Sequence, residues 1–219
     1  MKVNVKNALP KNNAVETRSV EAYFSPSDEE GVVIGRPIVY NSRTDLGMFD
    51  EIIESGALNN TNLQDVRFCL NHDTSFVYAR SRRNNSSSTM QLQIDEQGLL
   101  IKAKLDVENS AKAKDLYSAI KRGDIDKMSF MFVISDADWE DLDSDHPLRR
   151  IKSIATVVEV SAVTFPAYEA TEIDARSLEA LENAKAVLEN TRAQSVDTDN
   201  SLELEKAKYN YFFKNGGKK

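Results

Sequence analysis

The chain has 219 residues, of which 41% are hydrophobic and 29% charged, a composition typical of a soluble globular protein with one good core. Its formal net charge of −7 argues against a general nucleic-acid binder, because phosphate binding needs a basic surface. No apolar run approaches the roughly 18 residues of a membrane span, and the polar first residues lack the apolar core of a signal peptide.

The first part of the chain predicts an arm followed by short strands. Residues 1–18 are polar and rich in Asn and Lys, so we expect a mobile N-terminal arm. Apolar alternation predicts strands over 19–24 and 32–40, and Pro37 favours an edge or a bulge in the second. The stretch 49–58 carries short helical or extended signals.

A half-buried strand is predicted over 66–72, ending at His72. An imidazole at the rim of a sheet is placed as a general base would be, although a histidine that caps the strand end fits these residues equally well. Cys69 is the single cysteine, which excludes an intramolecular disulfide and fits a reducing compartment. Cys69 lies three residues before His72 and is a possible nucleophile, but a small packed side chain is the favoured interpretation.

Metal binding is not favoured by the histidine and cysteine content. His72 and His146 are the two histidines, and no Cys or His pair has metal-ligand spacing. We therefore expect no metal or other cofactor, with a zinc ion held by histidine and carboxylates as the alternative that remains open.

A loop, a hairpin and a helix follow. Residues 80–88 are basic and rich in Ser and Asn, which predicts a mobile loop. Alternation on both sides of Gly98 predicts a hairpin over 90–105. Asn109 or Ser110 caps the next helix, which Gly123 ends. The apolar face of this helix is formed by Ala113, Leu116 and Ile120.

The helix leads directly to a candidate nucleophile. A strand begins near Met128, and Ser129 has the opposite parity to the apolar Met128 and Phe130. The preceding helix would hold the turn to Ser129 rigidly in place, as a nucleophile requires, although most serines at strand starts are turn or edge residues.

The last strand region contains a glutamate among valines. Residues 135–145 are acidic around Trp139 and predict an exposed loop, in which the indole is a lid, a partner contact or a cover of the rim. Residues 151–165 predict one long strand or two joined by a bend. Glu159 lies within it, where a carboxylate is rarely buried without a partner; a water-facing edge glutamate is the alternative.

The C-terminal part predicts an amphipathic helix within 169–190, a linker over 191–200 and a short helix over 202–213. The resulting division is the arm of 1–18, a domain of 19–176 and a helical, partly disordered tail of 177–219. The tail docks either on a partner or on the body of the protein.

These elements together favour an α+β, mainly β, fold. Several strand signals, mostly ordered as hairpins, surround one firm helix. We expect a closed or nearly closed antiparallel β-barrel with helices packed outside.

A series of motifs gives these elements a family resemblance. They are GAL at 56–58, LNHD at 70–73, DEQGLL at 95–100, LYSAIKRGDIDKMSF at 116–130 and EVSAVTFPAY at 159–168. In this order and spacing they resemble the phage prohead (capsid maturation) serine protease family, over 19–176. The chain departs from the family pattern at Met131 and at Ala79, where the family usually has glycine. The resemblance implies a barrel like that of the herpesvirus assembly proteases.

The resemblance also implies a catalytic triad. Ser129 would be the nucleophile, His72 its base and Glu159 the group that orients the imidazole. His146 is the alternative third member, copying the His-Ser-His pattern of the herpesvirus enzymes, but it lies in an acidic loop, which is a poor rigid mount. By analogy with those enzymes, backbone N–H groups around 149–150 would form the oxyanion hole.

The biological role implied by the resemblance is capsid maturation. The family's enzymes are packaged in assembling proheads in the host cytoplasm, cleave scaffolding segments from the major capsid protein and digest themselves; a homo-oligomer fits this role. Neither nucleic acid nor membrane is an expected partner. Two other classes remain: a non-catalytic scaffold or capsid-interior binding protein with a protease-like fold, and a cysteine hydrolase using Cys69 and His72. The second is disfavoured because side chains three apart on a strand point to opposite faces.

Overall fold

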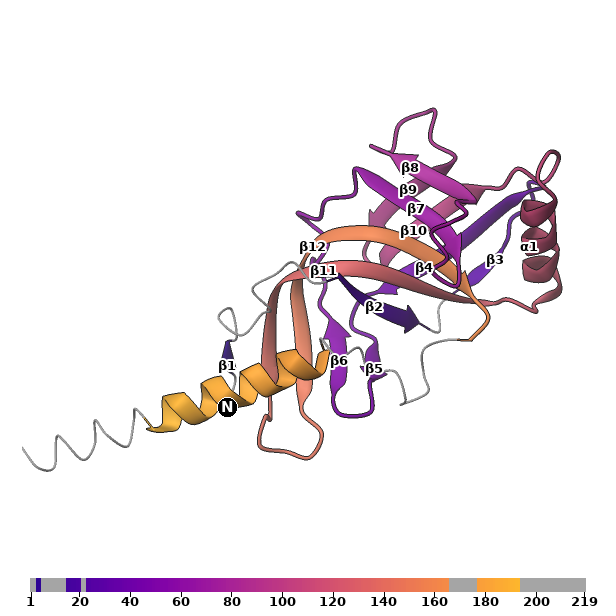
Figure 1. Ribbon diagram of the computed structural model, residues 1–219. Coiled ribbons are helices and arrows are strands. Elements are labelled where there is room, and N and C mark those ends of the chain that lie inside the picture. Colours follow the sequence, from indigo (N-terminus) through magenta and orange to yellow (C-terminus); the bar gives the residue numbers. More distant parts are fainter. Residues whose placement is uncertain (1–2, 5–14, 21–22, 166–176, 194–219) are drawn as a thin grey trace, which may run out of the picture.

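The computed structural model describes residues 3–4, 15–20, 23–165 and 177–193 (Figure 1). These residues form two β-sheets and two helices, so the α+β, mainly β, class is confirmed. The larger sheet has the order β1-β11-β12-β6-β5. In addition, β2 pairs with β11, β7 pairs with β12, and β8 pairs with β7. The smaller sheet has the order β3-β4-β10-β9.

The helices are α1 (Ala111–Arg122) and a C-terminal helix over 177–193. The strands are β1 (Val3–Asn4), β2 (Val15–Val20), β3 (Phe24–Pro26), β4 (Val32–Val39), β5 (Arg43–Asp45), β6 (Asp50–Ile53), β7 (Asp65–Leu70), β8 (Ala79–Arg82), β9 (Met90–Asp95), β10 (Gly98–Lys104), β11 (Lys127–Glu140) and β12 (Leu148–Val163).

The expected antiparallel barrel is wrong for the described residues, because neither sheet closes on itself and the larger one is mixed. β12 is antiparallel to β11 but parallel to β6 through 148–151 and to β7 through 159–162. With 16 residues, β12 is long enough to pair with two successive short strands along one edge. Apolar alternation in the sequence is the same for parallel and antiparallel partners, so it did not indicate this arrangement.

The β11–β12 ribbon is the longest feature of the fold. It pairs from Lys127 opposite Val163 to Glu140 opposite Leu148. The pairing register shifts at several points between Met131 and Ala137, and both strands curve through the body of the molecule (Figure 1). The end of the ribbon near Lys127 carries the candidate catalytic residues Ser129 and Glu159, and the other end packs against the C-terminal helix.

The expected exposed loop over 135–145 is wrong, since β11 continues to Glu140 and the Trp139 side chain is 2% exposed. The acidic side chains that suggested a loop have cationic partners on β12. Lys152 forms an ion pair with Asp138, and Arg150 lies 3.0 Å from the Glu140 carboxylate. The local sequence of 135–145 does not indicate that these acidic side chains have ion-pair partners on another strand.

Two hydrophobic clusters of described residues stabilise the fold. The main one joins both sheets and α1. The second contains Phe49 and Trp139, whose ring centroids are 4.9 Å apart, and the apolar stripe of the helix over 177–193. Of the two docking alternatives for the tail, the structure places this helix on the body of the protein. Its buried residues are Ala180, Leu181, Ala184 and Leu188.

The hairpin and the first helix follow their sequence signals. β9 and β10 form the predicted hairpin. The Ser110 hydroxyl accepts the Ala113 N–H at the start of α1, and Gly123 ends the helix with a left-handed φ of 79°.

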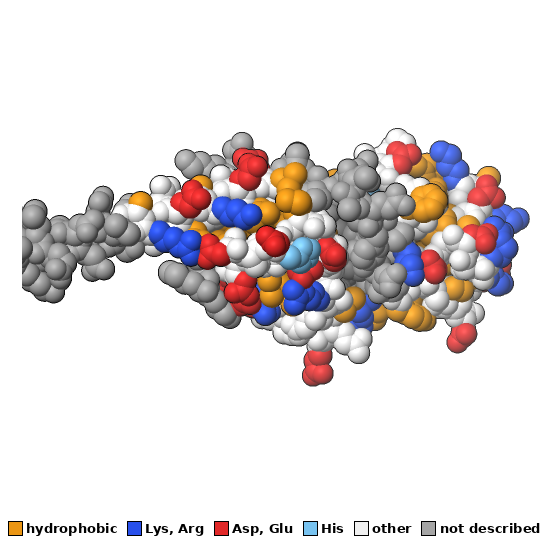
Figure 2. All heavy atoms as spheres, turned by 90° about the horizontal axis from the view of Figure 1, so that it is seen from below, with side chains coloured by type: hydrophobic (Ala, Val, Ile, Leu, Met, Phe, Trp, Pro, Cys, Tyr) orange, Lys and Arg blue, Asp and Glu red, His pale blue; other side chains and the backbone are white. Residues whose placement is uncertain are grey.

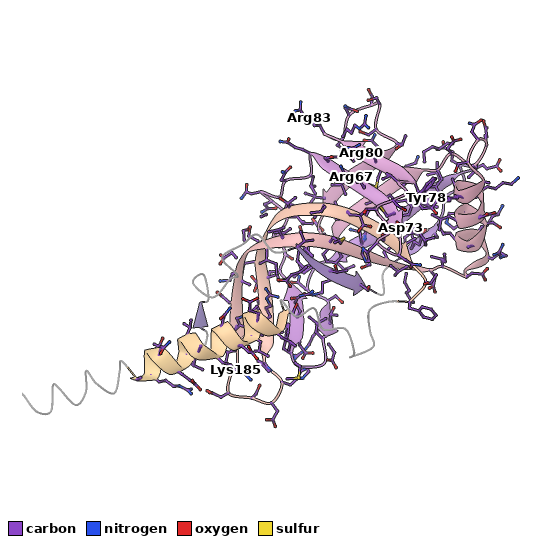
Figure 3. All side chains as sticks on the ribbon, in the orientation of Figure 1. Arg67, Asp73, Tyr78, Arg80, Arg83 and Lys185 are labelled. Atoms are coloured by element: carbon purple, nitrogen blue, oxygen red, sulfur yellow. The ribbon has the colours of Figure 1, made fainter. Side chains whose placement is uncertain are left out.

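Other elements begin or end at different residues from those predicted. The first predicted strand lies earlier, as β2, so residues 15–18 of the expected arm belong to the sheet. Part of the expected loop over 80–88 forms β8, on which Arg80 lies close to Arg67 of β7 (Figure 3). Both guanidinium groups bind the Asp65 carboxylate. The segments 166–176 and 194–219, which hold the other predicted tail elements, lie outside the described residues.

Surface charge is mixed on the face seen in Figure 2, where acidic and basic side chains are interspersed among the coloured residues. Within the described part of the chain, no helix combines the length and the apolar character needed to cross a membrane.

A buried cluster of charges ties β2 to the rest of the larger sheet. Arg18 donates to the Glu51 carboxylate at 2.6 Å and to Glu16 at 2.5 Å. Arg149 donates to Glu16 at 2.9 and 3.0 Å. The Ser177 hydroxyl, at the start of the C-terminal helix, also contacts this cluster. Two carboxylates and two guanidinium groups balance one another, as buried charges require.

Candidate active site

Ser129 is held in β11, next to the turn that follows α1. Its neighbours Met128 and Phe130 are fully buried and face the main core. By alternation, the Ser129 side chain lies on the opposite face of the sheet. The residue is itself 0% exposed, so its hydroxyl must find partners within the protein.

The sequence predicted a strand that ends at His72, but in the structure His72 lies in a left-handed turn after the strand. β7 ends at Leu70, and Asn71 and His72 have φ values of 51° and 60°. Asn and His tolerate this region better than most residues. Two backbone N–H groups attach the turn to β12: Asn71 N–H donates to the Ala162 carbonyl (2.9 Å) and His72 N–H donates to the Ser161 side-chain hydroxyl (3.1 Å).

The three predicted catalytic residues meet in the structure. His72 Nε2 is 2.7 Å from Ser129 Oγ, and His72 Nδ1 is 2.7 Å from Glu159 Oε2. They meet because β12 lies between β11 and β7, with Glu159 opposite Met131 on one side and Arg67 on the other. His72, which follows β7, therefore reaches Glu159 on the adjacent β12 and Ser129 on β11 beyond it.

The carboxylate determines the proton arrangement of the imidazole. Glu159 is 1% exposed, and an ionised carboxylate can only accept, so Nδ1 carries the proton and Nε2 is left with a lone pair. That lone pair faces Ser129 Oγ and can take its proton. The water-facing alternative for Glu159 is therefore wrong.

The Ser129 hydroxyl has a second acceptor. The carbonyl oxygen of Arg18 in β2 lies 2.8 Å from Ser129 Oγ. This strand pairs with β11, and Ser19 is directly opposite Ser129. Because the hydroxyl has one proton, the Arg18 carbonyl competes with His72 for it.

Cys69 does not provide a competing nucleophile. It is fully buried, and burial, followed by the nearby Glu159 carboxylate, raises the pKa of its thiol to about 12. A cysteine nucleophile acts as the thiolate, which this environment suppresses at neutral pH.

His146 is not brought to the triad. Its Nε2 lies 3.0 Å from Asp50 Oδ1 and 3.5 Å from Asp45 Oδ1, near the opposite end of the β11–β12 ribbon. Within the described residues, these three side chains are the one cluster that could hold a metal ion. Asp50 already forms an ion pair with Arg43, whose positive charge would oppose a metal ion there.

The stretch 149–150, expected to supply oxyanion-hole donors, also lies at that end of the ribbon. Both residues belong to β12. Arg149 pairs there with Trp139 and Glu51, and its guanidinium group belongs to the buried charge cluster.

Ser161 is a polar residue of the site that was not predicted from the sequence. Ser161 donates its hydroxyl to Glu159 Oε1 and accepts the His72 N–H. Its signal was the two-residue spacing from Glu159, which places both side chains on one face of a strand.

A serine hydroxyl, an imidazole and a buried carboxylate joined by two hydrogen bonds are the arrangement of the serine hydrolases. Comparison with protein families matches residues 13–186 to the family described as Caudovirus prohead serine protease. The chain belongs to this family, which confirms the predicted membership and implies a serine peptidase. Searches of curated proteins and of solved structures gave no match, and the similarity to the herpesvirus enzymes stays a prediction.

Proposed function

We propose that the protein is a serine endopeptidase that cleaves scaffolding segments of the major capsid protein, and itself, inside the assembling prohead. The observation that carries the proposal is the continuous hydrogen-bond chain from Ser129 through His72 to Glu159. The family description supports the setting of the reaction in the prohead.

In the proposed reaction, Ser129 Oγ attacks the scissile carbonyl carbon while His72 Nε2 takes the hydroxyl proton. Glu159 accepts the Nδ1 hydrogen bond and stabilises the imidazolium. The imidazolium then gives its proton to the leaving amine, and water hydrolyses the acyl-enzyme by the same route. Before attack, the Ser129 proton has to be directed toward His72 rather than toward the Arg18 carbonyl.

The partners in this proposal are the major capsid protein, scaffold segments and further copies of the chain, all within proheads in the host cytoplasm. A non-catalytic scaffold or capsid-interior binding protein with the same fold is the alternative. Such a protein has no need of a base and a buried carboxylate aligned on one serine hydroxyl, so the hydrogen-bond chain favours the enzyme.

Co-expression with its own capsid protein, followed by mass spectrometry of the cut sites, tests the proposal. Ser129→Ala removes only the nucleophilic hydroxyl, and Ser153→Ala is a matched control on β12, where Ser153 contacts the Ser135 hydroxyl. We expect processed products from the unmodified chain and from Ser153→Ala, and none from Ser129→Ala. Processing by Ser129→Ala at near the unmodified rate would refute the nucleophile assignment, and fluorophosphonate labelling separates an enzyme from a binding protein.

A further inference from the structure

Ser161 is a buried hydroxyl that contacts two different parts of the site. Its side chain is 0% exposed and lies two residues beyond Glu159 in β12. It donates to Glu159 Oε1 and accepts the backbone N–H of His72 at 3.1 Å. The reaction as proposed above gives this residue no role.

The proton assignments around Ser161 are mutually consistent. The His72 N–H can only donate and the Glu159 carboxylate can only accept, so the hydroxyl accepts from the first and donates to the second. Glu159 Oε2 in turn accepts from His72 Nδ1 at 2.7 Å. The result is a closed ring that runs from the His72 backbone through Ser161 and Glu159 back to the His72 side chain.

This ring acts on the carboxylate first. One oxygen of Glu159 is held by Ser161 and the other by His72, so both the position and the rotation of the carboxylate plane are determined. Without the hydroxyl, the imidazole would be the one remaining hydrogen-bond partner of the carboxylate among the described residues, and the carboxylate could turn about its terminal bond.

The ring also acts on the backbone of His72. Two consecutive non-glycine residues in the left-handed region are unfavourable and persist only when their surroundings hold them. The Ser161 hydroxyl is the partner of the His72 N–H in this turn. Together with the Asn71 N–H bond to the Ala162 carbonyl, this contact holds the backbone from which the imidazole projects.

The space around Ser161 supports the same conclusion. Ser129 lies opposite it on β11 and Cys69 opposite it on β7, so three small side chains form a row across one face of three strands. This row leaves room for an imidazole to lie over the sheet between Ser129 and Glu159.

We propose that Ser161 is a positioning residue of the site, one that sets the Glu159 carboxylate and the His72 backbone in a single geometry. The inference rests on the proposed function for its effect on rate, but its structural part stands on the hydrogen bonds alone. Ser161 acts through these two residues and does not touch the scissile bond.

The test compares Ser161→Ala and Ser161→Cys with the unmodified chain and with Ser153→Ala. Cysteine nearly preserves the size of the side chain but is a weak donor and acceptor, so it separates hydrogen bonding from packing. Circular dichroism establishes which variants are folded. Two readouts follow for those: cleavage kinetics, and the proton NMR resonance of His72 Nδ1–H, which a hydrogen bond to a carboxylate moves downfield.

In folded Ser161→Ala and Ser161→Cys we expect kcat to fall about ten- to a hundredfold with a smaller change in KM, as for loss of one hydrogen bond to a charged group. The Nδ1 resonance should shift or broaden, and Ser153→Ala should change neither readout. Wild-type kcat with an unshifted resonance in either folded variant would overturn the proposal, as would a lost rate with an unchanged resonance. An inactive unmodified chain would instead refute the proposed function, and the resonance would still test Ser161.

Discussion

Replacing Glu159 by glutamine tests the role of the buried carboxylate with almost no change of shape. The side chain is 1% exposed and accepts from His72 Nδ1 and from the Ser161 hydroxyl. Because Ser161 donates to one of the two oxygens, we expect the amide oxygen of the glutamine to take that position. The amide NH₂ then faces His72 Nδ1.

The magnitude follows from the imidazole tautomer. An NH₂ group facing Nδ1 forces this nitrogen to accept a hydrogen bond, so the ring proton moves to Nε2. A protonated Nε2 has no lone pair and cannot take the Ser129 proton. In serine proteases a wrong tautomer of this kind lowers kcat by about 10⁴. A reversed amide would keep the tautomer and lose only the negative charge. We therefore expect a loss of about two to four orders of magnitude, or about 3 to 5 kcal/mol of barrier.

The assay is the rate at which capsid-protein fragments appear, measured on variants with the unmodified circular dichroism spectrum. The matched control is His146→Ala, which removes the other histidine. His146 contacts Asp50 and Asp45 and no triad residue, so its loss should change the rate less than about threefold. A Glu159→Gln rate within about tenfold of that of the unmodified chain, or a larger loss in His146→Ala, would refute this reasoning.

Three further outcomes are expected. Leu181→Ala removes a buried side chain of the second hydrophobic cluster and should lower the free energy of unfolding by about 2 to 4 kcal/mol in urea titrations, whereas Lys185→Ala, on the exposed face of the same helix (Figure 3), should change it by less than about 0.5 kcal/mol. Burial would raise the pKa of Glu16, but Arg149 and Arg18 lower it to about 2. The ionised Glu16 carboxylate therefore contributes fully to the free energy of unfolding above pH 4.5, and this contribution is lost as the pH falls toward 2. Urea titrations between about pH 6 and pH 2 should lose up to about 3 kcal/mol from this group, and Glu16→Gln should remove that part of the acid dependence; an unchanged acid dependence would contradict the assignment. Iodoacetamide should leave cleavage intact and Cys69 unmodified in the folded protein, as mass spectrometry of the alkylated peptide would show, and inhibition that follows alkylation would favour the cysteine hydrolase.

The parts of the fold that were predicted correctly are those whose signals lie close together in the sequence. α1 was predicted with both ends because Ser110 and Gly123 are encoded next to the helix they bound. The hairpin of β9 and β10 was predicted because alternation and Gly98 lie within one short segment. The three candidate catalytic residues came from motifs, and the structure brings them within hydrogen-bond distance.

The features that were missed depend on partners distant in sequence. The left-handed turn at Asn71 and His72 has only a weak local marker, because Asn and His tolerate positive φ but neither is glycine, and the turn is held by β12. The contact between Ser129 and the Arg18 carbonyl joins backbone and side chain 111 positions apart. Similarly, Trp139 was taken for a loop residue because Phe49 and the C-terminal helix that cover it lie far along the chain.

The buried charge cluster constrains how the sequences of relatives can drift. Arg149 donates to both oxygens of Glu16, 133 positions away, and these two residues are 0% and 2% exposed. Loss of either one alone leaves the buried cluster of Glu16, Glu51, Arg18 and Arg149 with an unbalanced charge, which is strongly destabilising, whereas an apolar pair of similar volume is often tolerated. Lineages that replace Arg149 should therefore have replaced Glu16 as well, and the two positions should vary as a pair across the family.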